Sequence, residues 1–175
     1  MHKTIKTMNK KITDDLRIIE FEMQHAQAFK DLNIAWIAKS FFVEESDERV
    51  LSDPQKYFLN AGGRILLAEY KGTVAGTCAL MPANMNGSGI DEGEETFELT
   101  KMAVDENLRG LKIGYHLGSA TLELAKEMGA KRVILHSNKE GSAAAIQLYY
   151  KLGFKEIPLG NAPWKRANIK MEIFL

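Results

Sequence analysis

The hydrophobic positions of this chain follow two different periods, and the alternation between them predicts both strands and helices. Apolar residues at helical spacing, with their cap residues, predict helices over residues 25–42, 54–60, 115–128 and 142–152. Runs rich in β-branched and aromatic residues predict strands over residues 16–22, 64–70, 73–81, 97–104, 131–136, 154–157 and 167–175. The resulting order, β-α-α-β-β-β-α-β-α-β-β, indicates an α/β fold with a mixed sheet.

Turn and cap residues support several of these boundaries. Lys71-Gly72 separates two strand-like runs and predicts a hairpin. Asp53-Pro54 predicts a helix start, because Asp accepts hydrogen bonds from free amides and Pro has no N–H at the first helical position. The acidic residues 44–48 have two interpretations, a solvated helix end or an attractive field for a cationic substrate. Residues 83–95 predict a mobile, acidic loop.

Size and composition limit the classes of protein to consider. The 175 residues suffice for one domain, which we expect over residues 13–175, preceded by a flexible tail over residues 1–12. Lys and Arg together number 23, as do Asp and Glu, so bulk charge does not predict a nucleic-acid partner. Cys78 is the single cysteine, which suits a reducing cytoplasm. No run reaches the ~20 apolar residues of a membrane span, so we expect a cytoplasmic protein.

The turn over residues 108–114 joins a predicted strand to a predicted helix. Free amides and the helix dipole make such a turn a site for anions, and Arg109 and Lys112 add positive charge. The glycines at 110, 114 and 118 are spaced by four and match neither the Walker loop nor G-x-G-x-x-G. Two interpretations stay open: the turn holds a pyrophosphate, or the glycines let the helix lie close to the sheet.

Four segments together resemble a known family. They are residues 98–104 (ELTKMAV), residues 109–114 (RGLKIG), Asn138 at a predicted strand end, and residues 145–154 (AIQLYYKLGF). In this order they are similar to the phosphate turn R/Q-x-x-G-x-G/A and the later A-x-x-L-Y-x-x-x-G-F of the GNAT superfamily of acyl-CoA N-acyltransferases. The resemblance implies a GNAT fold: a mixed, mostly antiparallel sheet of about seven strands with a central splay, flanked by about four helices.

The resemblance also implies acetyl-CoA as co-substrate and a set of residues that hold it. Pantetheine would lie along Met102, Ala103 and Val104, and Asn138 would bind it or order a water. The pyrophosphate would be held by the amides of Arg109, Gly110, Leu111, Lys112, Ile113 and Gly114, and Tyr149 would lie beside the thioester. Lys112 replaces the first glycine of the family turn, so we expect right-handed backbone geometry there.

Acetyl transfer to an amine requires an acid for the leaving thiolate and a base for the amine proton. The resemblance assigns the acid to Tyr149, whose alternative role is a core aromatic. Glu98 is the candidate base, with a solvated strand-edge carboxylate as the alternative. Strand alternation predicts that Glu98 and Met102 share one side. His116 and His136 are further candidates for proton transfer, with exposure and packing as the alternatives.

The acceptor is the least determined part of the prediction. In the family it docks outside the cofactor core, where this chain supplies acidic and aromatic residues, namely Trp36, Phe41, Phe42, Glu44, Glu45, Asp47, Asp91, Glu92, Glu94 and Trp164. Acids beside aromatics favour a cationic amine. No residue cluster has metal-ligand spacing, so we predict no metal. A homodimer is plausible for this family. The alternatives are a non-catalytic acyl-CoA-binding or sensor module, and a transferase of a longer acyl group.

Overall fold

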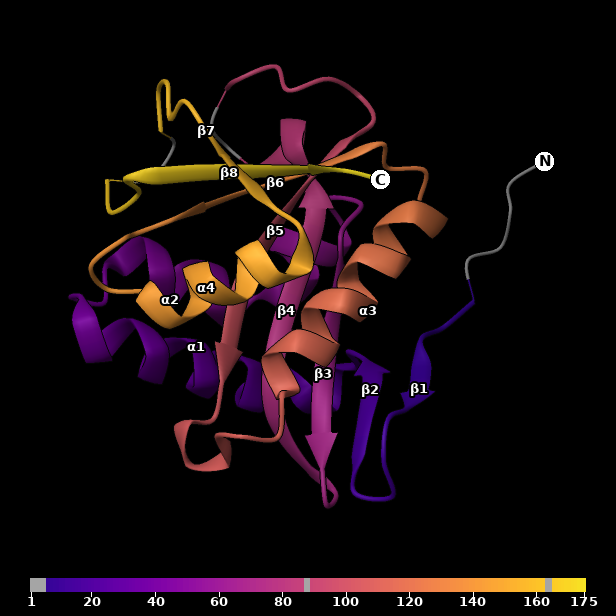
Figure 1. Cartoon of the computed structure of the whole chain (residues 1–175). Coiled ribbons are helices and arrows are strands. Elements are labelled where there is room, and N and C mark those ends of the chain that lie inside the picture. Colours follow the sequence, from indigo (N-terminus) through magenta and orange to yellow (C-terminus); the bar gives the residue numbers. More distant parts are fainter. Residues whose placement is uncertain (1–5, 87–88, 163–164) are drawn as a thin grey trace.

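One sheet of eight strands organises the protein, in the order β1-β2-β3-β4-β5-β6-β8-β7 (Figure 1). The computed structural model describes residues 6–86, 89–162 and 165–175. The strands are β1 (Asn9–Lys11), β2 (Leu16–Glu20), β3 (Arg64–Tyr70), β4 (Thr73–Pro82), β5 (Thr96–Val104), β6 (Arg132–Ser137), β7 (Lys155–Ile157) and β8 (Ile169–Phe174). Neighbouring strands pair antiparallel except β5 and β6. The predicted mixed, mostly antiparallel α/β fold is confirmed, with β1 as an additional strand.

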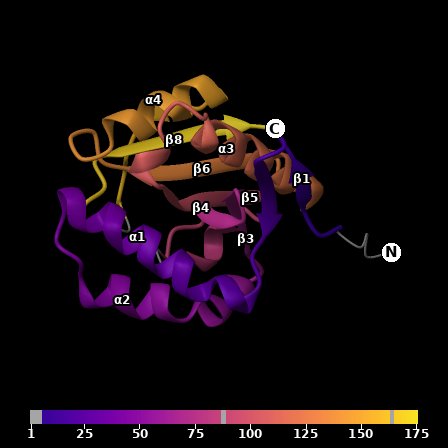
Figure 2. The same ribbon diagram turned by 90° about the horizontal axis from the view of Figure 1, so that it is seen from below.

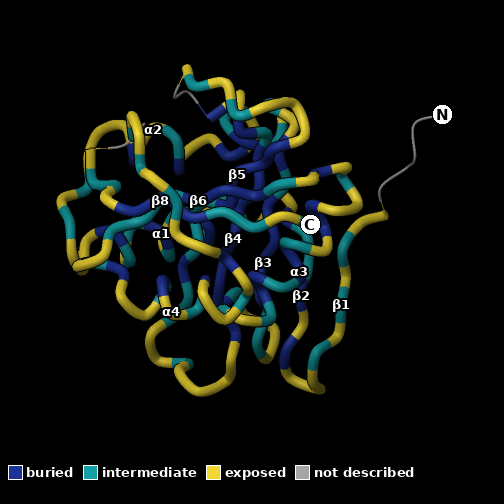
Figure 3. Tube along the Cα trace, turned by 45° about the horizontal axis from the view of Figure 1, so that its top comes forward, coloured by how far each residue is buried: buried dark blue, intermediate teal, exposed yellow. Residues whose placement is uncertain are grey.

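Helices cover both faces of this sheet. They are α1 (Ala26–Ser40), α2 (Glu45–Ser52), α3 (Ile113–Glu127) and α4 (Ala143–Leu152), with short helical turns η1 (Met23–His25), η2 (Gln55–Leu59), η3 (Ala83–Met85) and η4 (Glu106–Leu108). Figure 2 shows α1 and α2 on one side of the sheet and α3 and α4 on the other. Each side has its own hydrophobic core, and the central strands are the most buried elements (Figure 3). The two cores hold the sheet rigidly between the helix layers.

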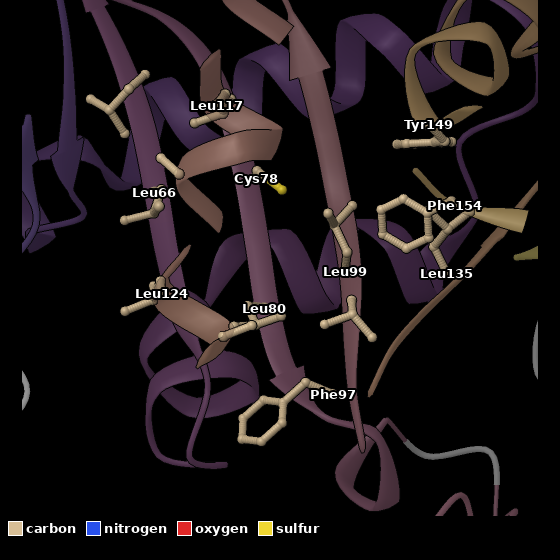
Figure 4. Close-up of a cluster of buried hydrophobic side chains, with 14 of the residues drawn as sticks. Leu66, Cys78, Leu80, Phe97, Leu99, Leu117, Leu124, Leu135, Tyr149 and Phe154 are labelled. Carbon is tan, nitrogen blue, oxygen red and sulfur yellow. The ribbon is translucent and has the colours of Figure 1, made fainter. Parts of the chain in front are cut away.

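The core beneath α3 and α4 contains Cys78, as Figure 4 shows. The thiol is completely buried, and this burial raises its pKa to about 12. Cys78 is therefore the small core residue that its apolar surroundings in the sequence predict. The face of α3 predicted to be apolar is buried in the same core, at Ile113, Leu117 and Leu124.

The first third of the chain contains one wrong prediction, the flexible tail, and one helix that was not predicted. Residues 9–11, expected in a flexible tail, form β1, because Met8 and Ile12 pack on the core and Asn9 pairs with Ile19 of β2. The acidic residues 44–48 begin a complete helix, α2. Glu44 and Asp47 form a capping box there, each side chain accepting from the backbone amide of the other.

The hairpin predicted around Lys71-Gly72 is confirmed. Both turn residues have positive φ, 49° and 79°, the geometry of a two-residue turn whose twist matches the flanking strands. The predicted cap is also present, since the carboxylate of Asp53 accepts from the amide of Lys56 at 3.0 Å. The segment that follows is the π-helical turn η2 rather than an α-helix.

A bulge at Lys101 divides β5 and corrects the predicted alternation. Ala79 pairs with Thr100, whereas Thr77 pairs with Ala103, so two residues of β5 oppose one residue of β4. Lys101 itself has φ 52°. The bulge reverses the alternation: Met102 and Val104 pack on the core beneath α3, while Glu98 faces the α1 side with its neighbour Met81. Glu98 and Met102 therefore lie on opposite faces.

The predicted central splay lies between β5 and β6. The two strands pair in parallel only over residues 96–98 and 132–134. Beyond this pairing β5 continues to Val104 and β6 to Ser137. The diverging strand ends leave backbone groups without a strand partner and open a path between the two faces of the sheet.

Candidate active site

The turn before α3 presents a row of amides that nothing in the described part of the chain accepts. His116 N donates to Lys112 O at 3.0 Å, but the amides of residues 109–115 have no acceptor among the described residues. Gly110 has φ 84° and Lys112 has φ 54°. The expected right-handed geometry at Lys112 was wrong: the lysine adopts the left-handed conformation of the family glycine. The turn thus has the free amides at a helix start that are typical of anion sites.

Two glycines of α3 bear on the second interpretation of this turn, in which the glycines let the helix pack closely against its neighbours. A Cβ on Gly118 would lie 2.5 Å from Cδ1 of Leu152, and a Cβ on Gly114 would lie 3.0 Å from Cδ2 of Leu148. A Cβ on Gly110 would meet nothing within 4 Å. Gly114 and Gly118 therefore allow α3 to pack closely against α4, whereas Gly110 allows the left-handed turn.

A groove of about 900 Å³ extends from this turn along β5 to the start of α4. Of the predicted cofactor-binding residues it is lined by Met102, Ala103, Val104, Arg109, Gly110, Lys112, Ile113 and Gly114. Leu111 is exposed outside the groove. His116 also lines the groove. It is the first residue of α3 whose amide is hydrogen-bonded, to the carbonyl of Lys112.

A second cavity, of about 560 Å³, lies on the α1 and α2 side of the splay. Glu98, Lys101, His136 and Tyr149 all line it. Trp36 and Met102 line both the groove and this cavity. The two spaces therefore meet at the middle of β5, and we call the second one the acceptor cavity.

Glu98 and His136 form a buried pair at the base of the splay. Nδ1 of His136 lies 2.9 Å from Oε1 of Glu98, and both side chains are 3% exposed. Asn86 donates to the other carboxylate oxygen. Since a carboxylate is an acceptor, Nδ1 of His136 is the donor of this hydrogen bond. Nε2 is buried without a partner among the described residues. Glu98 is thus no solvated strand-edge carboxylate, and His136 does more than pack.

Tyr149 lies on the buried face of α4. Its ring is 5.9 Å from that of Phe154, and Figure 4 shows the two together beside Leu135. Burial raises the pKa of the phenol well above its usual value, so Tyr149 is protonated at neutral pH. The residue is at once part of the core and part of the cavity wall. Its neighbour Tyr150 is exposed and lies 3.4 Å from Glu156.

Asn138 has its side-chain groups engaged within the protein. Its Nδ2 donates to the carbonyl of Arg166 at 2.8 Å, and its Oδ1 accepts from the amides of Glu140 and Gly141 at 3.0 and 2.8 Å. It lines neither the groove nor the acceptor cavity. These bonds fix the turn before α4 and attach the segment at Arg166 to it, and a direct contact with cofactor stays a prediction.

The acidic residues expected to attract a cationic acceptor are largely engaged. Arg166 donates to both oxygens of Asp47 at 2.7 and 2.8 Å. Lys170 and Arg132 both pair with Glu92. Of the aromatic residues, Trp36 lines the cavity, Phe42 is exposed, and Trp164 lies outside the described residues. These ion pairs join residues that are far apart in the chain, so they could not be predicted from the sequence.

The described residues contain neither a candidate metal cluster nor a candidate membrane span. No three His, Cys, Asp or Glu side chains lie close enough together there to hold a metal ion. No helix in those ranges is both long and apolar enough to cross a membrane.

The model of the Acetyltransferase (GNAT) family matches residues 30–154, which is more than half of the chain. This chain belongs to that family. A curated relative, N-acetyltransferase family 8 member 2 of Rattus norvegicus, is 29% identical over 123 residues, covering 70% of this chain. The match spans 52%, about half, of that relative's length.

Solved structures share the fold. An acetyltransferase of the GNAT family from Staphylococcus aureus Mu50 aligns with a TM-score of 0.78 and 23% identity, over 91% of this chain and 99% of its own. The acetyltransferase yncA from Salmonella typhimurium, solved with its cofactor acetyl-CoA, aligns with a TM-score of 0.70 and 19% identity, over 93% and 95%. At these identities the likeness establishes the GNAT fold.

Proposed function

We propose that this protein transfers an acetyl group from acetyl-CoA to a primary amine by direct attack in a ternary complex. The observation that carries the proposal is the row of unpaired amides over residues 109–115, at one end of a groove that meets a cavity beside Tyr149. Family membership and the acetyl-CoA complex of yncA, a protein of the same fold, support the choice of cofactor.

The groove offers a place for the pyrophosphate, the pantetheine and the thioester of the cofactor in turn. The pyrophosphate accepts hydrogen bonds from the amides of residues 109–114 at the positive end of α3, with Arg109 and Lys112 as additional cations. Pantetheine then follows Met102, Ala103 and Val104, in the part of β5 from which β6 has diverged. The thioester arrives where Met102 borders both spaces.

The acceptor amine enters from the α1 and α2 side. An alkylammonium has a pKa of ~10, so its proton must leave before the nitrogen can attack. Glu98 takes this proton, directly or through a water, and His136 holds the carboxylate in place. The alternative solvated role for Glu98 does not fit a side chain that is 3% exposed.

Tyr149 completes the reaction. The amine lone pair forms the new C–N bond, the C–S bond breaks, and the thiolate sulfur takes the phenolic proton of Tyr149. The second amine proton leaves the nitrogen through solvent and restores the phenol, so the products are the neutral amide and the free thiol. The raised pKa of this tyrosine ensures that the proton is present at neutral pH. A thiol of cysteine-like pKa, ~8.5, leaves more readily when it is protonated as it departs.

The test is a screen of amines, amino acids and peptides with acetyl-CoA, in which free thiol is detected. Thiol release that requires both substrates supports transfer. Binding of acetyl-CoA without thiol release against the whole panel would instead support the acyl-CoA-binding or sensor module. A panel of longer acyl-CoA thioesters, measured with the best amine, then tests the third alternative.

A further inference from the structure

Lys101 lines the acceptor cavity with an ammonium group that lacks a partner. The bulge in β5 and the left-handed φ of 52° direct this residue into the cavity. A left-handed conformation is unfavourable for a residue with a side chain, and such strain persists at functional sites. No hydrogen bond or ion pair within the described ranges takes its Nζ. Burial lowers the pKa of Lys101, and the negative field of Asp47 opposes this change.

The carboxylates of the cavity act on Lys101 through their charge but form no hydrogen bond or ion pair with it, because each of them is bound elsewhere. Arg166 pairs with Asp47, and His136 and Asn86 bind Glu98. The side chain of Glu44 accepts from the amide of Asp47 in the capping box of α2. Three further cations line the same cavity, namely Arg49, Lys165 and Arg166. With Lys101, four cations line the cavity against three carboxylates, so its lining is not the acidic surface that the sequence suggested.

We propose that the acceptor is an amino acid or a similar amine with a carboxylate near the amine, and that Lys101 binds this carboxylate. The inference rests on the proposed function, because it assigns the amine of the same acceptor to Glu98. Glu98 and Lys101 are three residues apart, about 10 Å along a strand. An α-amino acid with one hydrogen bond at each end spans a distance of this order.

The first experiment measures acetyl transfer to matched acceptors. Free α-amino acids are compared with their carboxamides and with the decarboxylated amines, at saturating acetyl-CoA. The wild type is expected to prefer the acids by about tenfold or more in kcat/KM, as a charge-assisted hydrogen bond implies. Lys101→Met is expected to lose this preference, and Lys101→Arg to keep most of it. Lys71→Met is the matched control, because Lys71 is also left-handed, φ 49°, but lies in the hairpin turn.

A second readout separates this inference from the transferase proposal. Melting temperatures are measured with CoA and millimolar amino acid, for the wild type and for Lys101→Met. Turnover without preference for acids, or a preference that survives in Lys101→Met, overturns the carboxylate site and leaves the transferase standing. A shift in the wild type alone, without turnover, supports the site and contradicts the transferase. The absence of both turnover and shift overturns both.

Discussion

The carboxylate of Glu98 meets the imidazole of His136 at 2.9 Å, across the point where β5 and β6 diverge. Glu98 pairs with Ile134 at the end of the parallel register, and His136 follows two residues later on the same face of β6. The splay thus leaves the two side chains facing the same cavity. A histidine that donates to a carboxylate holds that carboxylate in position.

This pair predicts how the reaction responds to pH. Glu98→Gln removes the proposed proton acceptor but keeps the shape of the side chain and the contact with Asn86. We expect the pH–rate profile of kcat/KM to shift toward alkaline pH, because a larger share of the amine must then lose its proton to solvent. Lys139→Gln, on the surface, is the control. A profile that is unchanged in Glu98→Gln would assign the base to a water or to another residue.

Removing the hydroxyl of Tyr149 tests its proposed role as the general acid. Tyr149→Phe keeps the ring packed on Phe154 and removes only the hydroxyl. We expect kcat to fall by about 10²–10⁴, the usual contribution of general acid catalysis, with little change in the KM for acetyl-CoA. Tyr150→Phe, at the exposed neighbouring position, should retain activity. The acid role is wrong if Tyr149→Phe turns over at the wild-type rate.

The left-handed backbone at Lys112 predicts how substitutions at this position affect the binding of acetyl-CoA. Lys112 has φ 54°, which glycine tolerates and a β-branched residue strongly resists. Lys112→Gly should therefore bind acetyl-CoA within about threefold of the wild type, and Lys112→Ile should bind at least about tenfold more weakly. Titration calorimetry of both variants measures this. Equal losses in the two variants would mean that the lysine charge, and not the turn geometry, holds the cofactor.

The pair of Asp47 and Arg166 links α2 to the segment before β8 and predicts acid sensitivity. Burial raises the pKa of Asp47, but the hydrogen bonds from Arg166 and from the amide of Glu44, together with the charges of Arg166 and Lys101, outweigh it and hold the pKa below its usual value. Stabilisation from a carboxylate of lowered pKa is present above the unfolded value of ~3.9 and is lost as pH falls through the folded value. Asp47→Asn should therefore melt earlier than the wild type at pH 7.

The difference in melting temperature between Asp47→Asn and the wild type should narrow as the pH falls below about 4. Asp14→Asn, at an exposed acid of the β1–β2 turn, should show no such pH-dependent gap. A gap of constant size down to pH 3 would show that packing, rather than charge, accounts for the loss.

Much of the fold was predictable because its signals are local. The hairpin at Lys71-Gly72, the helix after the phosphate turn and the order of the strands each follow from short runs of sequence. Helix α2 was missed because its first five residues are three acids, a serine and an arginine. Its one buried hydrophobic residue is Leu51. Strand β1 was missed because its three residues, Asn9, Lys10 and Lys11, gain strand geometry only from pairing with β2.

The site was predictable in its parts but not in its arrangement. The groove residues follow from the family motif, because backbone amides at a helix start are a local feature. The bulge at Lys101 carries no glycine to reveal it, so simple alternation placed Glu98 on the wrong face relative to Met102. The contact between Glu98 and His136 joins residues 38 positions apart, and it depends on the splay. The same holds for Asp47 and Arg166, which are 119 positions apart.

The central claim is that the turn before α3 holds the pyrophosphate of coenzyme A, and a thermal titration tests it most directly. Acetyl-CoA should raise the melting temperature of the wild type, by a stabilisation of about 2.7 kcal/mol at one hundred times its Kd. S-acetyl-pantetheine, which has the same thioester but no pyrophosphate, should give a much smaller shift at the same concentration. A flat response to acetyl-CoA at millimolar concentration, or equal shifts with the two ligands, would contradict the claim.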